Sequence, residues 1–102
     1  MLTDEEVISN AKNKKIGEIS KICRNARMES GYKQWEIARY IGCQDSTLGC
    51  FETAKSFSGK IFLWYFCNLL NEEERKKVCD IGFDEKYANR YEEECAIWRK
   101  KA

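Results

Sequence analysis

The chain of 102 residues contains no proline and no histidine. Proline is the residue that most strongly breaks helices, so its absence leaves long helices possible everywhere. Histidine is the side chain that most often acts as a general base near neutral pH, and it is a common zinc ligand. The chain also lacks the run of ~20 apolar residues that a membrane-spanning helix needs. These absences favour a helical protein and disfavour an enzyme or a membrane protein.

An excess of one charge is also missing, because the formal net charge is only +1. The length of 102 residues is enough for one modest core but not for two. Hydrophobic residues make up 43% of the chain and aromatic residues 13%, which is typical of a globular protein and not of a disordered one. The first six residues, Met1 to Glu6, are too acidic for a signal peptide. We therefore expect one globular protein in the cytoplasm.

Six cysteines could indicate disulfides or a metal site, but no pair has the C-x-x-C spacing. Most of them fall where a helix needs a small apolar residue, so we expect core thiols in a reducing compartment, with disulfides or a metal as the alternatives. Cys50 is the exception, because it falls on an outward helix face. The set is Cys23, Cys43, Cys50, Cys67, Cys79 and Cys95.

The acidic triplets at 72–74 and 92–94 are consecutive on expected helices, so their carboxylates point in different directions. Such triplets are typical of solvated faces, and the sequence shows no phosphate-binding loop or nucleophile motif. We expect no catalytic residue, no metal site and no cofactor.

Apolar spacing predicts helices throughout, and the expected fold class is all-α. Thr3 and Glu6 form a capping-box pattern at the start of a short first helix. The following helices are expected at 16–29, 34–41, 45–53, 59–70, 72–80 and 84–101. The residues expected to face inward are Ile19, Ile22, Cys23 and Ala26 in the 16–29 helix, and Leu63, Trp64, Phe66, Cys67 and Leu70 in the 59–70 helix.

The most informative stretch runs from Lys33 to Lys55. Ile37, Ala38 and Ile41 share one helix face, and Leu48 and Phe51 repeat the pattern after a turn. Gly42 lies at the turn, where a residue without a Cβ can take positive φ. This pattern predicts two short helices joined by a tight turn, which is the form of a helix-turn-helix.

The stretch resembles the Xre/Cro-type helix-turn-helix of phage repressors and related bacterial regulators. The resemblance covers residues 16–70 and implies a five-helix repressor-like core. It does not explain the two ends of the chain, where helical spacing predicts an N-terminal helical segment (1–15) and a C-terminal helical extension (71–102). It also implies an ion pair between Arg27 and Glu52. The matching residues are Arg27, Gly31, Tyr32, Lys33, Gln34, Ile37, Ala38, Ile41, Gly42, Cys43, Leu48, Phe51 and Glu52.

The resemblance implies that double-stranded DNA is the partner and that the 45–53 helix reads an operator. Residues 12–60 hold ten Lys or Arg against five acids, a local charge of +5 that suits phosphate contacts. The phosphate contacts are expected at Lys33, Gln34, Lys55 and Lys60. The resemblance implies that the outward positions of this recognition helix are Gln44, Asp45, Ser46, Gly49, Cys50 and Thr53.

Two functions remain open at this stage. The first is a sequence-specific transcriptional regulator of phage or mobile-element origin. The second is a helix-turn-helix domain used for protein binding, such as a phage-encoded inhibitor of a host defence or regulatory protein, because Trp35 is expected to point outward and suits a protein contact.

The last expected helix carries an aromatic stripe with spacings of three and four residues. Either the stripe packs on the core of its own chain, or it forms the interface of a homodimer. Its members are Phe83, Tyr87, Tyr91, Cys95 and Trp98.

Overall fold

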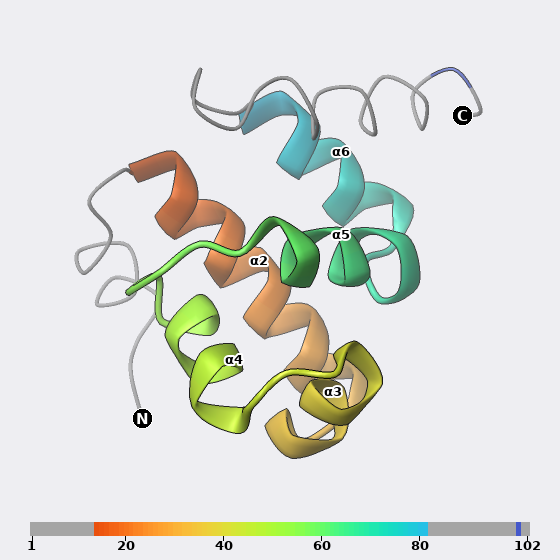
Figure 1. Cartoon of the computed structure of the whole chain (residues 1–102). Helices are drawn as coiled ribbons and strands as arrows, with labels where there is room; N and C mark the ends of the chain where they lie inside the picture. The colour runs from red at the N-terminus through yellow and green to blue at the C-terminus, as the bar shows by residue number, and fades with distance from the viewer. Residues whose placement is uncertain (1–13, 82–99, 101–102) are drawn as a thin grey trace.

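The computed structural model describes residues 14–81 and residue 100, and the described residues are helical without strands. Figure 1 shows the helices packed around α2, with α6 toward the top of the view and α3 and α4 toward the bottom. The all-α fold expected from the sequence is thereby confirmed. The helices are α2 (Lys14–Ser30), α3 (Gln34–Ile41), α4 (Asp45–Glu52), α5 (Gly59–Asn68) and α6 (Glu72–Ile81).

The central helix α2 buries the face that its apolar spacing predicts. Ile19, Cys23 and Ala26 are buried, whereas Ile22 is only partly buried against the core. The helix ends at Ser30 and is followed by Gly31, whose φ of +79° lies in the left-handed region that glycine adopts without strain. The expected 16–29 helix is therefore correct to within two residues at each end.

The inward face of α5 differs from the expected one. Ile61, Phe62, Tyr65 and Phe66 are buried, whereas Leu63 and Trp64 are only partly buried. Cys67, expected to face inward, is exposed. The prediction was thus correct for Phe66 and Leu70, which are both buried, and wrong for Cys67. The error arises because α5 is apolar on nearly every side, so its hydrophobic spacing does not select one face.

The helix α6 belongs to the same core as α2. Asn71 caps it, since the Asn71 side-chain oxygen accepts from the Glu74 N–H at 2.8 Å and Glu74 accepts from the Asn71 N–H at 2.9 Å. Val78 and Cys79 are buried in the core cluster that α2 also lines. Part of the region expected to be a C-terminal extension therefore packs on α2.

The expectation that most cysteines are core thiols holds only for Cys23 and Cys79 among the described residues. Cys43 and Cys50 are partly buried, and Cys67 is exposed. Cys50 is thus less outward than expected, because the chain after α4 folds back over the end of that helix, with the N–H groups of residues 55 and 56 on the Cys50 carbonyl.

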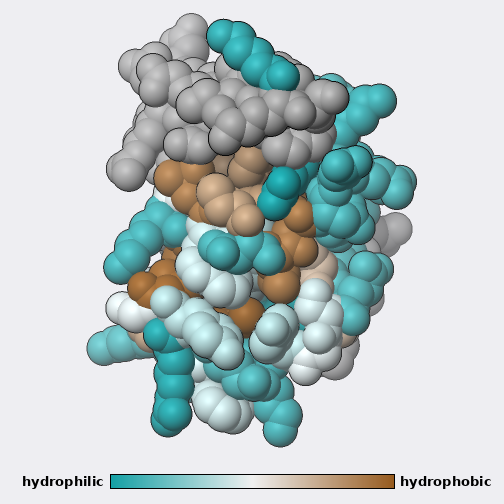
Figure 2. Space-filling model, turned by 90° about the vertical axis from the view of Figure 1, so that its right-hand side faces the viewer, coloured by the Kyte–Doolittle hydropathy of each residue, from teal (hydrophilic) through white to brown (hydrophobic). Residues whose placement is uncertain are grey.

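Within the described residues, none of the helices combines the length and the apolar composition that crossing a membrane requires. Apolar side chains do reach the surface, as Figure 2 shows at mid-height of one face, between hydrophilic side chains.

Candidate nucleic-acid interface

The turn between α3 and α4 is closed by backbone hydrogen bonds at Gly42. Gly42 has φ of +84°, and the N–H groups of Gly42 and Cys43 donate to the Ala38 carbonyl at 2.8 and 3.0 Å. Leu48 and Phe51, both fully buried, hold α4 against the core. The turn and these two anchors fix the angle between the helices, and α4 matches the expected 45–53 helix to within one residue.

The glycines and Ala54 give a prediction about stability in this region. Ala54 has φ of +62°, so Ala54→Gly is expected to raise the free energy of unfolding by about 1 kcal/mol. Gly49→Ala is expected to raise it by about 1 kcal/mol, because Gly49 is helical and a Cβ there would meet only Gln34 Oε1 at 3.9 Å. Gly42→Ala should lower it by about 1–2 kcal/mol, because alanine is strained at that positive φ.

Urea unfolding followed by circular dichroism checks these three changes, and each serves as a control for the others. If all three variants shifted the midpoint in the same direction, the backbone conformations assigned to the turn and the loop would be wrong.

A buried carboxylate joins four helices behind the helix pair. Glu52 is fully buried, and its two oxygens accept from Arg27 Nε at 3.0 and 2.8 Å. Gln34 Nε2 donates to the same carboxylate at 3.2 Å, and the Tyr65 hydroxyl also donates to it. Arg27 and Glu52, which the resemblance pairs, therefore form an ion pair that connects α2, α3, α4 and α5.

Burial is the largest cause of the raised pKa values of Tyr65, Cys23 and Cys43. Burial, and then the Glu52 carboxylate, raises the pKa of the Tyr65 phenol, so that Tyr65 stays protonated and keeps donating. Burial also raises the pKa of the Cys23 thiol. The pKa of Cys43 is raised by burial, against the opposing effect of Lys60. These two thiols are therefore neutral near pH 7 and are poor nucleophiles.

The residues of α4 that are expected to contact DNA differ in exposure. Gln44, Asp45 and Ser46 are exposed at the start of α4, whereas Gly49 and Cys50 are half-buried along it. No side-chain hydrogen bond caps α4 at Gln44, which leaves that amide available to a partner.

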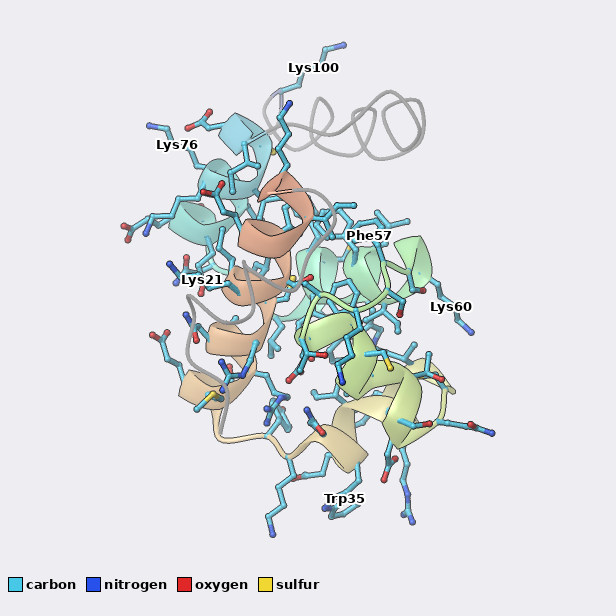
Figure 3. All side chains as sticks on the ribbon, turned by 90° about the vertical axis from the view of Figure 1, so that its left-hand side faces the viewer. Lys21, Trp35, Phe57, Lys60, Lys76 and Lys100 are labelled. Atoms are coloured by element: carbon cyan, nitrogen blue, oxygen red, sulfur yellow. The ribbon has the colours of Figure 1, made fainter. Side chains whose placement is uncertain are left out.

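The three lysines expected to contact phosphate are all exposed. Lys33 is exposed at the start of α3, Lys55 is exposed in the loop after α4, and Lys60 is exposed in the first turn of α5. Figure 3 shows Lys60 pointing away from the body of the molecule. Gln34 is half-buried, because its amide is held by Glu52. The hydrogen bond to the buried Glu52 carboxylate thus holds the Gln34 side chain in place.

The chain makes a tight turn directly after α4. Ala54 is left-handed and buried, and its N–H donates to the Phe51 carbonyl at 3.1 Å. The N–H of Lys55 donates to the Cys50 carbonyl at 2.9 Å. This turn carries Lys55 just past the end of α4.

An exposed aromatic surface accompanies the pair, and only Trp35 was expected from the sequence. Trp35 is 46% exposed, with the Arg39 guanidinium 5.1 Å from its ring centre. Tyr40 is 64% exposed and stacks on Trp64 with ring centres 6.1 Å apart. Tyr32 meets Tyr40 edge to face. Tyr40 follows Arg39 on the outward side of α3, a position that helical spacing alone could have indicated.

The expected dimer interface lies outside the residues that the structure describes, as does the expected first helix at the N-terminus. The interface residues concerned are Tyr87, Tyr91, Cys95 and Trp98. In the described part of the chain, no group of three or more Cys, Asp or Glu side chains could hold a metal ion.

Comparison with known proteins adds no relative: no family model, no curated protein and no solved structure matches this chain.

Proposed function

We propose that the chain is a DNA-binding transcriptional regulator of the phage repressor-like type, reading an operator through α4. The observation that carries the proposal is the rigid helix pair itself. The inner side of α4 is fixed by Leu48, Phe51 and Glu52, while its exposed start offers polar side chains to a groove. An exposed helix on a fixed support is what major-groove reading requires.

The charges support DNA as the partner. Lys33, Lys55 and Lys60 are exposed at the start of α3, after α4 and at the start of α5, where they can meet phosphates. Gln44 is the exposed residue that can form a bidentate contact with adenine, whereas Asp45 repels phosphate and suits a cytosine amino group. Affinity should therefore come mainly from phosphate contacts and depend strongly on salt.

Lys33→Gln and Lys55→Gln are expected to weaken binding to every duplex about equally. Each should reduce the slope of log K against log salt by ~0.9, because each removes one phosphate contact. Gel shifts with the DNA upstream of the coding sequence and with a random duplex, at 50–200 mM salt, measure the slope.

Lys76→Gln is the matched control, since Lys76 is exposed on α6 and lies at the end of the molecule opposite Trp35 in Figure 3. An unchanged slope for Lys33→Gln and Lys55→Gln would remove both residues from the interface. Absence of binding to either duplex at 50 mM salt would contradict the proposal as a whole.

The exposed aromatic surface favours a second candidate, a helix-turn-helix domain that binds a protein. Tryptophan, tyrosine and arginine are the residues that most often dominate binding energy at protein interfaces. Trp35, Arg39 and Tyr40 all lie on the solvent side of α3. The partner would be a host defence or regulatory protein that covers this face. If DNA binding is found and Trp35→Ala leaves it unchanged, this surface is not needed for operator binding.

We further propose a homodimer through Tyr87, Tyr91, Cys95 and Trp98. Two copies can place their α4 helices about 34 Å apart, one turn of DNA, and so double a contact surface that is small in one copy. Sedimentation equilibrium should show a dimer for the unchanged protein and a folded monomer for the Tyr91→Glu/Trp98→Glu variant. A variant that unfolds would place the stripe in the core instead, and a monomeric unchanged protein would remove the dimer.

A further inference from the structure

A groove of about 420 Å³ runs between α2 and α6. Ile22 and Ile81 line it, and both are only partly buried against the core. The rest of the lining is polar: Glu18, Lys21, Asn25 and Glu29 from α2, and Glu74, Lys77 and Asp80 from α6. The groove therefore combines an apolar strip with charged walls.

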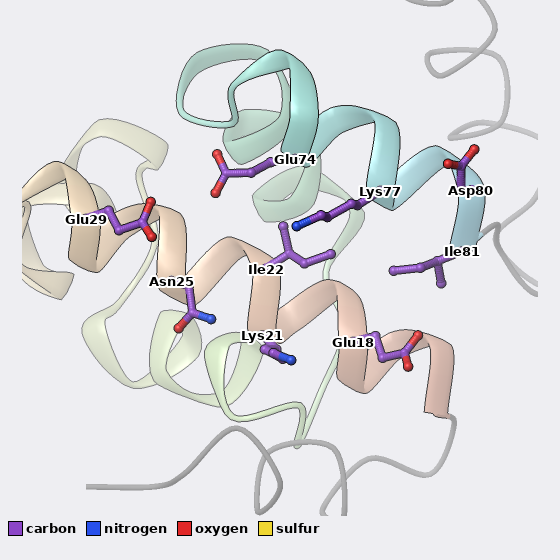
Figure 4. Close-up of a pocket in the computed structure, with 9 residues that line it drawn as sticks. All are labelled: Glu18, Lys21, Ile22, Asn25, Glu29, Glu74, Lys77, Asp80 and Ile81. Atoms are coloured by element: carbon purple, nitrogen blue, oxygen red, sulfur yellow. The ribbon is translucent and has the colours of Figure 1, made fainter.

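The charges along the walls are unevenly neutralised. Glu18, Glu29 and Asp80 form no ion pair with any described residue, and Lys77 pairs with Glu73, which does not line the groove, at 3.6 Å. In Figure 4, Glu18 and Asp80 lie toward one end and Glu29 lies at the other, with Lys21 and Lys77 between them. The groove thus has acidic ends and a net negative charge.

The length of the groove follows from the helix geometry. Glu18 and Glu29 are eleven positions apart on α2, which is about 16 Å at ~1.5 Å per residue. That is about three helical turns. A volume of about 420 Å³ over this length holds a row of side chains, not a whole helix.

We propose that the groove binds an amphipathic helix of another protein, with an apolar row against Ile22 and Ile81 and a Lys or Arg near each end of the row. Docking of an apolar helix face into a groove is an established mode of peptide recognition. The cations of the partner would meet Glu18 and Asp80 at one end and Glu29 at the other, which also fixes the position of the helix along the groove.

Charge disfavours two other occupants. A second copy of the groove carries the same negative charge, so two grooves facing each other would repel. Residues 1–13 hold three acids and one lysine, so that segment is repelled as well. The inference is independent of DNA binding, because neither α3 nor α4 lines the groove.

The test uses the full chain and a dye-labelled synthetic peptide. The peptide is an amphipathic helix with leucines on one face and lysines eleven positions apart, and its control has the same composition with the leucines scattered around the helix. Fluorescence anisotropy measures affinity, and amide NMR shifts locate the contact. We expect saturable binding of the amphipathic peptide, at least tenfold tighter than the scrambled one, with shifts centred on Ile22, Asn25 and Ile81.

Charge reversal at either end then tests the register. Glu29→Lys and Asp80→Lys should each weaken binding at least tenfold, whereas Glu72→Lys, an exposed acid of α6 outside the groove, should change it less than twofold. If one reversed variant fails to fold, the other still decides. Equal binding of the scrambled peptide, no binding to the full chain, shifts centred on α3 and α4, or equal effects of all three variants would overturn the proposal.

Discussion

Glu52→Ala is expected to lower the free energy of unfolding by about 3–5 kcal/mol, because removing one partner of a buried ion pair leaves the other uncompensated. Glu52 is fully buried, and the Arg27 side chain is only 13% exposed. Gln34 and Tyr65 would lose the same acceptor. Urea unfolding followed by far-UV circular dichroism measures the loss, which is a large share of the ~5–15 kcal/mol typical of a small protein.

Glu73→Ala is the matched control, because it also removes a carboxylate from an ion pair. The Lys77–Glu73 pair is 3.6 Å long, and its side chains are 62% and 79% exposed, so its loss should cost about 0.5 kcal/mol or less. A double-mutant cycle with Arg27→Ala isolates the coupling between Arg27 and Glu52. If Glu52→Ala and Glu73→Ala unfold at the same urea concentration, the carboxylate does not hold the four helices together.

The helix pair could be predicted from sequence because several local signals agree there. Ile37, Ala38 and Ile41 mark one face of α3, and Gly42 supplies a turn that other residues take only with strain. The polar residues between Cys43 and Leu48 separate the two apolar patterns. Where local preference and hydrophobic spacing point to one structure, the boundaries come out correct to within one residue.

The inner face of α5 could not be predicted in the same way. Lys60 and Asn68 are the strongly polar residues of this helix, and they are eight positions apart, so several rotations of the helix bury similar apolar area. In the structure the buried face is the one that carries Tyr65, whose hydroxyl donates to the Glu52 carboxylate, thirteen residues earlier in the chain. The apolar spacing within α4 or within α5 cannot indicate a contact between residues of the two helices.

The candidate sites also differ in whether the sequence could predict them. The Arg27–Glu52 pair was predicted from the resemblance, which implies an ion pair between these two positions. The groove between α2 and α6 was missed, because its acids look like ordinary solvated helix faces in sequence. Only the packing of α6 on α2 brings Glu18 and Asp80 to one end of a shared groove.

Phe51→Ala is expected to lower the free energy of unfolding by about 3–5 kcal/mol, the range for truncating a fully buried phenylalanine. Phe51 is 0% exposed, and its ring stacks on Tyr65 with centres 5.8 Å apart. It is also the anchor that holds α4 next to the Glu52 cluster. The loss should appear as a lower urea midpoint and as weaker binding to all duplexes, because α4 would no longer be held at a fixed angle.

Phe57→Ala is the comparison that tests whether the effect belongs to the anchor of α4. Phe57 touches Phe51 with ring centres 5.8 Å apart, but it is only partly buried, so its truncation removes less apolar surface from the core. Phe51→Leu, which keeps most of the buried volume, should fall between the two, since the cost rises with the cavity left behind. If Phe51→Ala costs no more than Phe57→Ala, α4 is held in place chiefly by Leu48 and the Glu52 carboxylate, and the aromatic stack contributes little to the angle of α4.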